Sequence, residues 1–182
     1  MTFNNQKKSI LSRKDKSDKG QIDKRIKPFV DLINSKRDYY TTSSCSGRIG
    51  ILTEGKKGQA KWIFKTHEPV KPNQITHVLE KQKDQKLWFR QEPLILHICC
   101  RDIKPAQKLL SITQKAGFKR TGIIGINKRI LVEVKSDEII FTPIYKDTSL
   151  TPKNYIKLLV KEANKKLKQN LKKIGKLEKA FR

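Results

Sequence analysis

The sequence predicts an α+β fold, in which a mixed, mostly antiparallel sheet is covered by helices and a long helix lies at the C-terminal end. Short apolar runs alternate with polar residues and turn signals through residues 38–145, as expected for strands. Residues 1–37 and 151–182 show helical spacing of apolar residues instead. We therefore expect one domain, 1–182, with a basic helical lead-in, a sheet-rich core and a long basic helix.

The lead-in, residues 1–37, carries an apolar stripe in its second half. Five apolar residues recur there at helical spacing: Ile22, Ile26, Phe29, Val30 and Ile33. Pro28 falls inside this stripe and removes a backbone donor, so it predicts a kink or a helix end.

The core should contain strands separated by turns and by two helices. Strands are expected over 38–42, 48–53, 60–66, 87–90, 94–100, 121–126, 129–134 and 139–145. One helix is expected over 73–83 with Asn73 as its cap. The other is expected over 104–116, with Pro105 in its first turn and Gly117 just beyond its end.

The last segment gives the clearest helical pattern. Thr151 and Pro152 predict an N-cap and a first turn. An apolar stripe then continues to Leu177. Between Pro152 and Arg182 there are eleven Lys or Arg residues and two acidic ones. Any single lysine fits a solvated face as well as an RNA contact, but the face as a whole favours RNA.

The charge of the chain limits its partners. A formal net charge of +25 indicates a polyanion, either nucleic acid or an anionic membrane face. No apolar segment approaches the roughly 20 residues needed to span a bilayer, and the N-terminus does not resemble a secretory signal. We therefore expect a cytoplasmic protein without a membrane partner.

The cysteines and histidines indicate neither a disulfide framework nor a metal centre. Cys45, Cys99 and Cys100 form no CxxC pair, and the three histidines have no zinc-binding spacing. Adjacent Cys99 and Cys100 are expected to pack as small hydrophobes on opposite faces of a strand. An odd cysteine count of this kind is typical of a reducing compartment.

A run of small polar residues, 43–47, followed by Arg48, lies between two expected strands. Such a run fits a serine-rich turn, and it also fits a loop that approaches a ligand closely. Arg48 favours the second interpretation, because its planar fork of donors suits an anionic or planar polar ligand.

This run, Ser43-Ser44-Cys45-Ser46-Gly47-Arg48-Ile49, resembles the signature of the tRNA wybutosine-synthesising N-4 methyltransferases, the third-step enzymes of that pathway. The resemblance extends along most of the chain in matching order. Its other pieces are Lys19-Gly20 with Asp23, Trp62 with His67, Glu92-Pro93 with His97, Gly117-Phe118-Lys119, and Ala163-Asn164-Lys165 with Asn170.

The resemblance implies a reaction, a cofactor and a partner. That family transfers a methyl group from S-adenosylmethionine to N-4 of a tricyclic guanosine derivative, which lies next to the anticodon of phenylalanine tRNA. Its members are not Rossmann-type methyltransferases, so the absence of a Gly-x-Gly-x-x-Gly segment here counts neither for nor against the resemblance.

The resemblance also assigns candidate roles. His97 or His67 would be the general base, and Glu92 would orient it or take that role itself. The cofactor-binding set is Ser43, Ser44, Cys45, Ser46, Gly47, Arg48 and Asn164. Arg48 would bind a carboxylate, which belongs either to the cofactor or to the aminocarboxypropyl arm of the substrate base.

RNA contacts are assigned to a third set, Lys19, Trp62, Lys119, Lys165 and Asn170. Candidates for stacking on the target base are Trp62, Trp88, Tyr39 and Tyr40, although ordinary packing is the favoured interpretation for Trp88. The alternative to the enzyme is a non-catalytic RNA-binding accessory protein in which the serine run is only a turn. The charge supports both, whereas the ordered motifs support only the enzyme.

Overall fold

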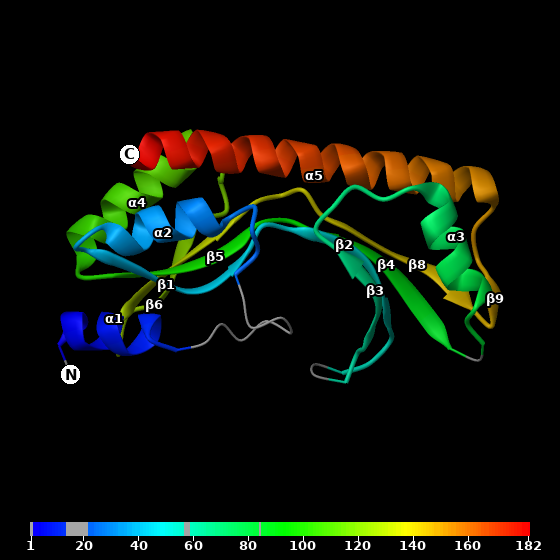
Figure 1. Cartoon of the computed structure of the whole chain (residues 1–182), viewed down its shortest axis with the longest axis horizontal. Coiled ribbons are helices and arrows are strands. Elements are labelled where there is room, and N and C mark those ends of the chain that lie inside the picture. The colour runs from blue at the N-terminus through cyan, green and yellow to red at the C-terminus, as the bar shows by residue number, and fades with distance from the viewer. Residues whose placement is uncertain (1, 14–21, 57–58, 84) are drawn as a thin grey trace. The chain divides into compact units, whose positions relative to one another are not determined.

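The computed structural model describes residues 2–13, 22–56, 59–83 and 85–182 (Figure 1). The α+β class is confirmed, and the strands are divided between two sheets in which every described pair is antiparallel. The chain forms two compact units built from non-contiguous segments. The first unit comprises Met1–Ser46, Leu94–Asp137 and Leu171–Arg182, and the second comprises Gly47–Pro93 and Glu138–Asn170.

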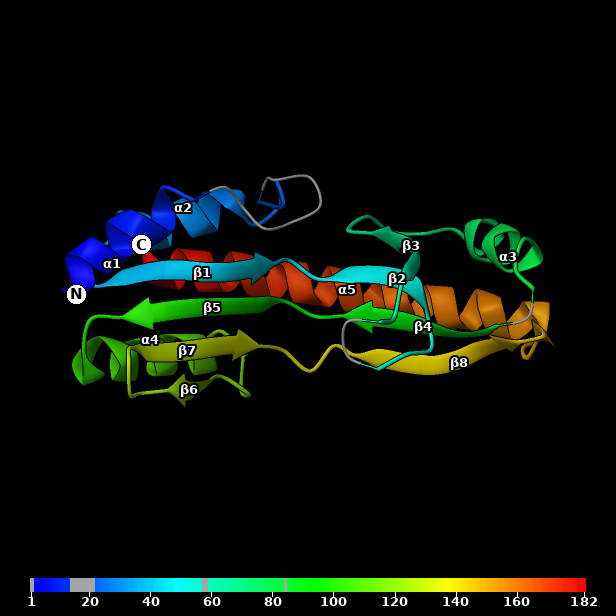
Figure 2. The same ribbon diagram turned by 90° about the horizontal axis from the view of Figure 1, so that it is seen from below.

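The first unit is built on a four-stranded sheet in the order β1-β5-β7-β6 (Figure 2). Its strands are β1 (Tyr39–Cys45), β5 (Ile95–Cys100), β7 (Ile130–Lys135) and β6 (Gly122–Gly125). Apolar residues of α2 (Lys27–Ser35), α4 (Ile103–Lys115) and the end of α5 (Lys153–Phe181) form the core on one face. On the other face, Phe3 of α1 (Phe3–Leu11) packs against the ring of Tyr40.

The second unit is built on a five-stranded sheet in the order β3-β2-β4-β8-β9. Its strands are β3 (Trp62–Thr66), β2 (Arg48–Thr53), β4 (Lys86–Glu92), β8 (Ile140–Lys146) and β9 (Thr148–Ser149). One face is covered by α3 (Pro72–Glu80) and by the first part of α5. Figure 1 shows both helices above this sheet, so its opposite face is left for polar and aromatic side chains.

The helices confirm the apolar spacing and correct two expected caps and one expected kink. Pro28 lies in the first turn of α2, where its missing N–H has no intrahelical partner to lose, so it neither kinks nor ends the helix. The helix α3 starts before Asn73, and the Gln74 side chain accepts from the Lys71 N–H at 2.7 Å. Pro152 precedes α5 and its carbonyl accepts the first helical hydrogen bonds, so Thr151 is not the cap.

The end of α4 is as expected. Gly117 has φ +100°, a left-handed conformation that glycine adopts without steric cost. The Phe118 N–H then donates to the Thr113 carbonyl at 2.9 Å and the Gly117 N–H to the Gln114 carbonyl at 3.0 Å. These two bonds satisfy carbonyls that the helix end leaves without partners.

The two adjacent cysteines pack on opposite faces of β5, as predicted. Cys100 belongs to the core of the first unit, and Cys99 contacts Tyr40 on the other face. Burial raises the pKa of the Cys99 thiol, and it raises the pKa of Cys100 to about 12. Both thiols are therefore protonated at neutral pH, when they are weak nucleophiles.

We expect iodoacetamide at pH 8 to label Cys45, which is half-buried, and to leave Cys99 and Cys100 unlabelled in the folded protein. The pKa of Cys100 lowers its thiolate fraction about a thousandfold from that of a thiol at the ordinary value of 9.0. Peptide mass mapping before and after denaturation checks this, and Cys45→Ser should abolish native labelling. Rapid native labelling of Cys100 would contradict the buried packing.

Candidate functional site

A cavity of about 480 Å³ opens on the second unit, on the sheet face that the helices do not cover. Alternation along β4 explains its lining. Leu87, Phe89 and Gln91 are buried, whereas the residues between them point to the opposite face. Those residues, Trp88, Arg90 and Glu92, all line the cavity.

Strand β2 brings Arg48 to the same face. Arg48 lies directly opposite Glu92, and Gly50 lies opposite Arg90. A Cβ atom on Gly50 would lie 2.7 Å from the Trp62 ring, so only glycine lets that ring lie against β2. The cavity therefore depends on a small residue in the middle of a strand.

Aromatic rings and cations alternate along the cavity. The Arg48 guanidinium lies 4.4 Å from the centre of the Trp62 ring, and that of Arg90 lies 4.9 Å from the centre of the Phe141 ring. Trp88 and Phe141 stack with their centres 4.5 Å apart and their planes at 15°. Planar groups with cations above them suit a ligand that is itself planar and polar.

Glu92 organises the charge of this cavity. Its Oε2 accepts from Arg48 Nε at 2.5 Å, and its Oε1 lies 3.3 Å from Arg90 Nη1. The Glu92 side chain is only 17% exposed, so these contacts are screened less than surface pairs are. Glu92 thus holds two guanidinium groups in place. The expected link between Glu92 and a histidine is absent from its described contacts.

His67 is fixed by the backbone of the polar run. Its Nδ1 lies 2.7 Å from the Gly47 carbonyl oxygen. A carbonyl oxygen only accepts, so Nδ1 carries the hydrogen and Nε2 is the accepting nitrogen of the neutral ring. Gly47 has φ +100°, and a Cβ atom there would lie 2.8 Å from the Glu92 carbonyl oxygen.

The polar run is largely a strand, which corrects the expected loop. Ser43, Ser44 and Cys45 belong to β1 and pair with His97, Leu96 and Ile95. The turn is therefore limited to Ser46 and Gly47. Because side chains alternate along a strand, Ser43 and Cys45 project from one face of the sheet and Ser44 from the other.

The serines also differ in their bonding. Ser46 is buried, and its hydroxyl donates to the carboxylate of Asp23, a residue of the family pattern. In contrast, no residue within the described ranges forms a hydrogen bond with the hydroxyls of Ser43 and Ser44. The latter two hydroxyls remain available to a ligand.

His97 lies between Ser43 and Glu133 in a row across the first unit's sheet. Its Nε2 lies 3.1 Å from Glu133 Oε1. A carboxylate accepts, so Nε2 carries the hydrogen and Nδ1 is the accepting nitrogen of the neutral ring. Glu133, which sequence reasoning missed, is the carboxylate that orients His97.

The other described residues predicted to bind the cofactor or RNA do not line this cavity. Both amide groups of Asn164 bond the backbone of Val70, at 2.9 and 2.8 Å, and thereby hold the segment before α3. Asn170 is fully buried, with its Nδ2 against Gly47. Lys119 and Lys165 are exposed, and Lys165 lies 3.8 Å from Glu162. Lys19 lies outside the described residues.

The stacking candidates are partly wrong. Tyr39 and Tyr40 are buried, and their hydroxyls bond Pro105 and Gln6, so neither offers an open ring. Trp88, expected in ordinary packing, lines the cavity instead. Phe141 was missed, although it is 53% exposed. The alternation of apolar and charged residues over 86–92 was the signal that could have placed Trp88 and Arg90 together.

The described residues include neither a metal-binding cluster nor a helix fit to span a membrane. They contain no group of three or more His, Cys, Asp or Glu side chains able to hold a metal ion. None of their helices combines the length and apolar character that crossing a membrane would require.

Comparison with known proteins shows the family of this chain. A family model described as methyltransferase TYW3 matches residues 5–182. A Thermococcus kodakarensis protein named tRNA(Phe) 7-((3-amino-3-carboxypropyl)-4-demethylwyosine(37)-N(4))-methyltransferase 2 is 34% identical over 167 residues, covering 90% of this chain and 79% of the relative. A tRNA wybutosine-synthesizing protein 3 homolog from Xenopus laevis is 34% identical over 180 residues, covering 94% and 71%.

A solved structure has the same fold over nearly its whole length. The PH1069 protein from Pyrococcus horikoshii superposes with a TM-score of 0.91 at 30% identity, over 100% of this chain and 96% of that one. The resemblance drawn from the polar run and the ordered motifs is thus confirmed. The chain belongs to the TYW3 methyltransferase family, and it is an enzyme.

Proposed function

We propose that this chain transfers a methyl group from S-adenosylmethionine to N-4 of a wybutosine precursor at position 37 of tRNA(Phe), the reaction for which its relatives are named. The observation that carries the proposal is the cavity of the second unit, where Arg48 is held between Glu92 and Trp62. A net charge of +25 supports an RNA substrate independently.

The cavity suits the modified base. The name of the Thermococcus enzyme describes a substrate with a 3-amino-3-carboxypropyl arm, which carries a carboxylate and an ammonium group. Arg48 and Arg90 match the carboxylate, Glu92 matches the ammonium group, and the rings of Trp62, Trp88 and Phe141 match the fused aromatic system. A base displayed in a single-stranded loop is accessible to such an open cavity.

S-adenosylmethionine supplies the methyl group when it is bound. Its carboxylate and ribose need small donors and acceptors, and the Ser43 hydroxyl, which lies beside His97 and has no partner among the described residues, has that character. Ser46 contributes by its bond to the Asp23 carboxylate, which ties the turn to another segment. Asn164 contributes by its two bonds to the backbone of Val70. Cys45 needs no nucleophilic role in this transfer.

The acceptor nitrogen starts with a hydrogen, which a base must remove. We assign His67 this role, because the Gly47 carbonyl fixes its tautomer with Nε2 as the accepting nitrogen. His97 is the second candidate, with Glu133 as its orienting carboxylate. The pH dependence of kcat in His67→Gln and His97→Gln variants separates the two.

The test is methylation in vitro of tRNA(Phe) from cells blocked at the preceding step, with nucleoside mass spectrometry as the readout. We expect one added methyl group, only in the presence of S-adenosylmethionine, and none on fully modified tRNA(Phe). Saturating cofactor should also stabilise the protein, by about 2.7 kcal/mol at a hundredfold excess over Kd. RNA binding without methylation or cofactor-dependent stabilisation would identify a non-catalytic RNA-binding protein instead.

Phe141→Ala should weaken tRNA binding by about five- to tenfold, or roughly 1 kcal/mol or more, because the Phe141 ring stacks on Trp88 and contacts the Arg90 guanidinium, and its loss releases two groups that line the cavity. Stability should change little, since the Phe141 side chain is 53% exposed. Filter binding at fixed salt measures the effect. Tyr155→Ala is the matched control, because Tyr155 is also 41% exposed in the second unit but lies outside the cavity. Equal effects would remove Phe141 from the interface.

A further inference from the structure

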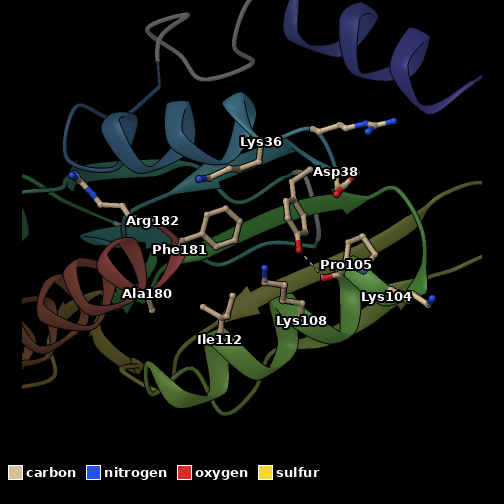
Figure 3. Close-up of a pocket in the computed structure, with 11 residues that line it drawn as sticks. Lys36, Asp38, Lys104, Pro105, Lys108, Ile112, Ala180, Phe181 and Arg182 are labelled. Carbon is tan, nitrogen blue, oxygen red and sulfur yellow. Dashed lines mark hydrogen bonds between the residues drawn. The ribbon is translucent and has the colours of Figure 1, made fainter.

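The first unit has a cavity of its own, of about 510 Å³ (Figure 3). Three segments far apart in the sequence meet there: the 36–39 segment that leads into β1, one side of α4 from Lys104 to Ile112, and the last residues of α5. Figure 3 shows Lys36 and Lys108 on opposite sides of the Phe181 ring. Of the residues that line this cavity, only Tyr39 was a candidate from the sequence, and that was for base stacking.

Buried aromatic residues give this cavity a fixed floor. The Tyr39 and Phe181 rings meet edge to face with centres 5.3 Å apart, and both residues are less than 10% exposed. Phe29 also packs against Phe181, edge to face, with ring centres 5.9 Å apart. The Tyr39 hydroxyl donates to the Pro105 carbonyl at 3.0 Å, which joins the floor to α4.

The rim of the cavity is strongly cationic. Five of its eleven lining residues are basic: Lys36, Arg37, Lys104, Lys108 and Arg182. The one acidic lining residue, Asp38, is already paired with Arg101 at 2.7 Å. Arg182 pairs with Glu178, but the other four basic side chains have no ion-pair partner among the residues that the structure describes.

The segment that carries two of these charges is held by its backbone. Lys7 Nζ donates to the Lys36 carbonyl at 2.5 Å, and Arg101 Nη2 donates to the Arg37 carbonyl at 3.0 Å. These bonds involve only backbone oxygens, so the side chains of Lys36 and Arg37 remain available. Lys104 adds a charge in the first turn of α4, where a cation is unfavourable and an anion is favourable.

We propose that this cavity binds the phosphodiester backbone of the RNA substrate, as a second contact in addition to the one made by the modified base. The inference rests on the proposed function only in taking RNA as the partner. Cations without acidic partners match phosphate oxygens. A rigid floor lowers the entropic cost of ordering these cations when the phosphates bind. The Tyr39 and Phe181 rings pack against one another, so they serve as support and not as a stacking surface for bases.

The test is the salt dependence of tRNA binding by the full chain. The variant K36Q/K108Q removes the two lysines that flank Phe181. We expect the slope of log Kobs against log[salt] to become shallower by about 0.7–0.9 for each phosphate that the variant no longer neutralises, and affinity near physiological salt to fall several-fold. KM for tRNA should rise, whereas kcat should stay within about twofold, since neither lysine belongs to the cavity of the second unit.

The matched control is K115Q/K128Q, which removes the same charge from two exposed lysines of the first unit that do not line the cavity. It should lower affinity less and leave the slope nearly unchanged. Equal slopes in the two variants would show that the cavity lysines attract RNA no more specifically than other surface lysines, which would overturn the proposal. So would a lower affinity for inorganic phosphate in K36Q/K108Q with tRNA binding unchanged, because it would indicate a site for a free anion.

The two proposals fail separately. If the wild-type chain methylates tRNA(Phe) and K36Q/K108Q keeps the wild-type slope, only the phosphate contact is wrong. If the wild-type chain binds tRNA without methylating it and the slope still changes in K36Q/K108Q, the contact stands and the proposed function fails.

Discussion

Arg48→Ala is expected to lower kcat/KM for methyl transfer by about a hundredfold or more, which corresponds to roughly 2.7 kcal/mol less transition-state binding. Among the described cations of the cavity, only the Arg48 guanidinium contacts both Glu92 and Trp62. Its removal takes away one of the two guanidinium groups that line the cavity and match the substrate carboxylate. Stability should fall by only about 1 kcal/mol, since the Arg48 side chain is 31% exposed and Glu92 retains Arg90.

Measuring both kinetics and cofactor binding shows whether Arg48 binds the substrate or the cofactor. KM for tRNA should rise in Arg48→Ala while the Kd for S-adenosylmethionine stays the same, and the reverse result would assign the cavity to the cofactor. Arg48→Lys should recover little activity, because an ammonium group cannot form the planar fork. Arg120→Ala is the control, since it removes an arginine that is also ion-paired, to Asp137, but is 67% exposed. Parallel losses of folding and activity in Arg48→Ala would make Arg48 structural.

Gly47→Ala is expected to destabilise the protein by about 2–4 kcal/mol and to reduce activity with it. A side chain at φ +100° is strained, and the added Cβ atom would lie 2.8 Å from the Glu92 carbonyl oxygen and 2.9 Å from Asn170 Nδ2. Relief of these contacts would move the residues on either side, Arg48 and Ser46. It would also move the carbonyl that fixes His67.

Denaturant unfolding of Gly47→Ala and Gly175→Ala checks the steric argument. Gly175 lies inside α5, and apart from its neighbours and the adjacent backbone of the helix no described atom lies within 4 Å of an added Cβ atom there. Gly175→Ala should therefore stabilise the protein by roughly 0.5–1 kcal/mol, because alanine favours the helix. A Gly47→Ala protein with wild-type stability would show that this turn can rearrange.

Local patterns predicted the helices well. The stripes over 104–116 and 151–182 correspond to α4 and α5, and Gly117 ends α4 as expected. Helical hydrogen bonds join residues close in sequence, so spacing and caps carry most of the information. The errors at Pro28 and Thr151 each concern the exact residue at which a helix starts. Proline and threonine both occur at several neighbouring positions around a helix start, so the residue type alone does not give the boundary.

The site was harder to predict, because pairing between distant strands decides it. Ser43 and Ser44 have turn chemistry, yet β5 supplies a pairing partner that draws them into β1. Trp88 and Phe141 stack only because β4 and β8 are adjacent, and nothing near either residue encodes that contact. Glu133 lies 36 residues from His97 for the same reason.

The two units alternate along the chain, so neither can be expressed as one continuous fragment. The backbone passes from one unit to the other four times, after residues 46, 93, 137 and 170. No uninterrupted stretch of the gene therefore encodes either unit alone. Ending the chain after residue 137 removes parts of both units, whereas ending it after residue 170 removes only part of the first unit, including Ile174, Leu177 and Phe181 of its core. The two units are therefore encoded and synthesised as one chain, although each has its own core.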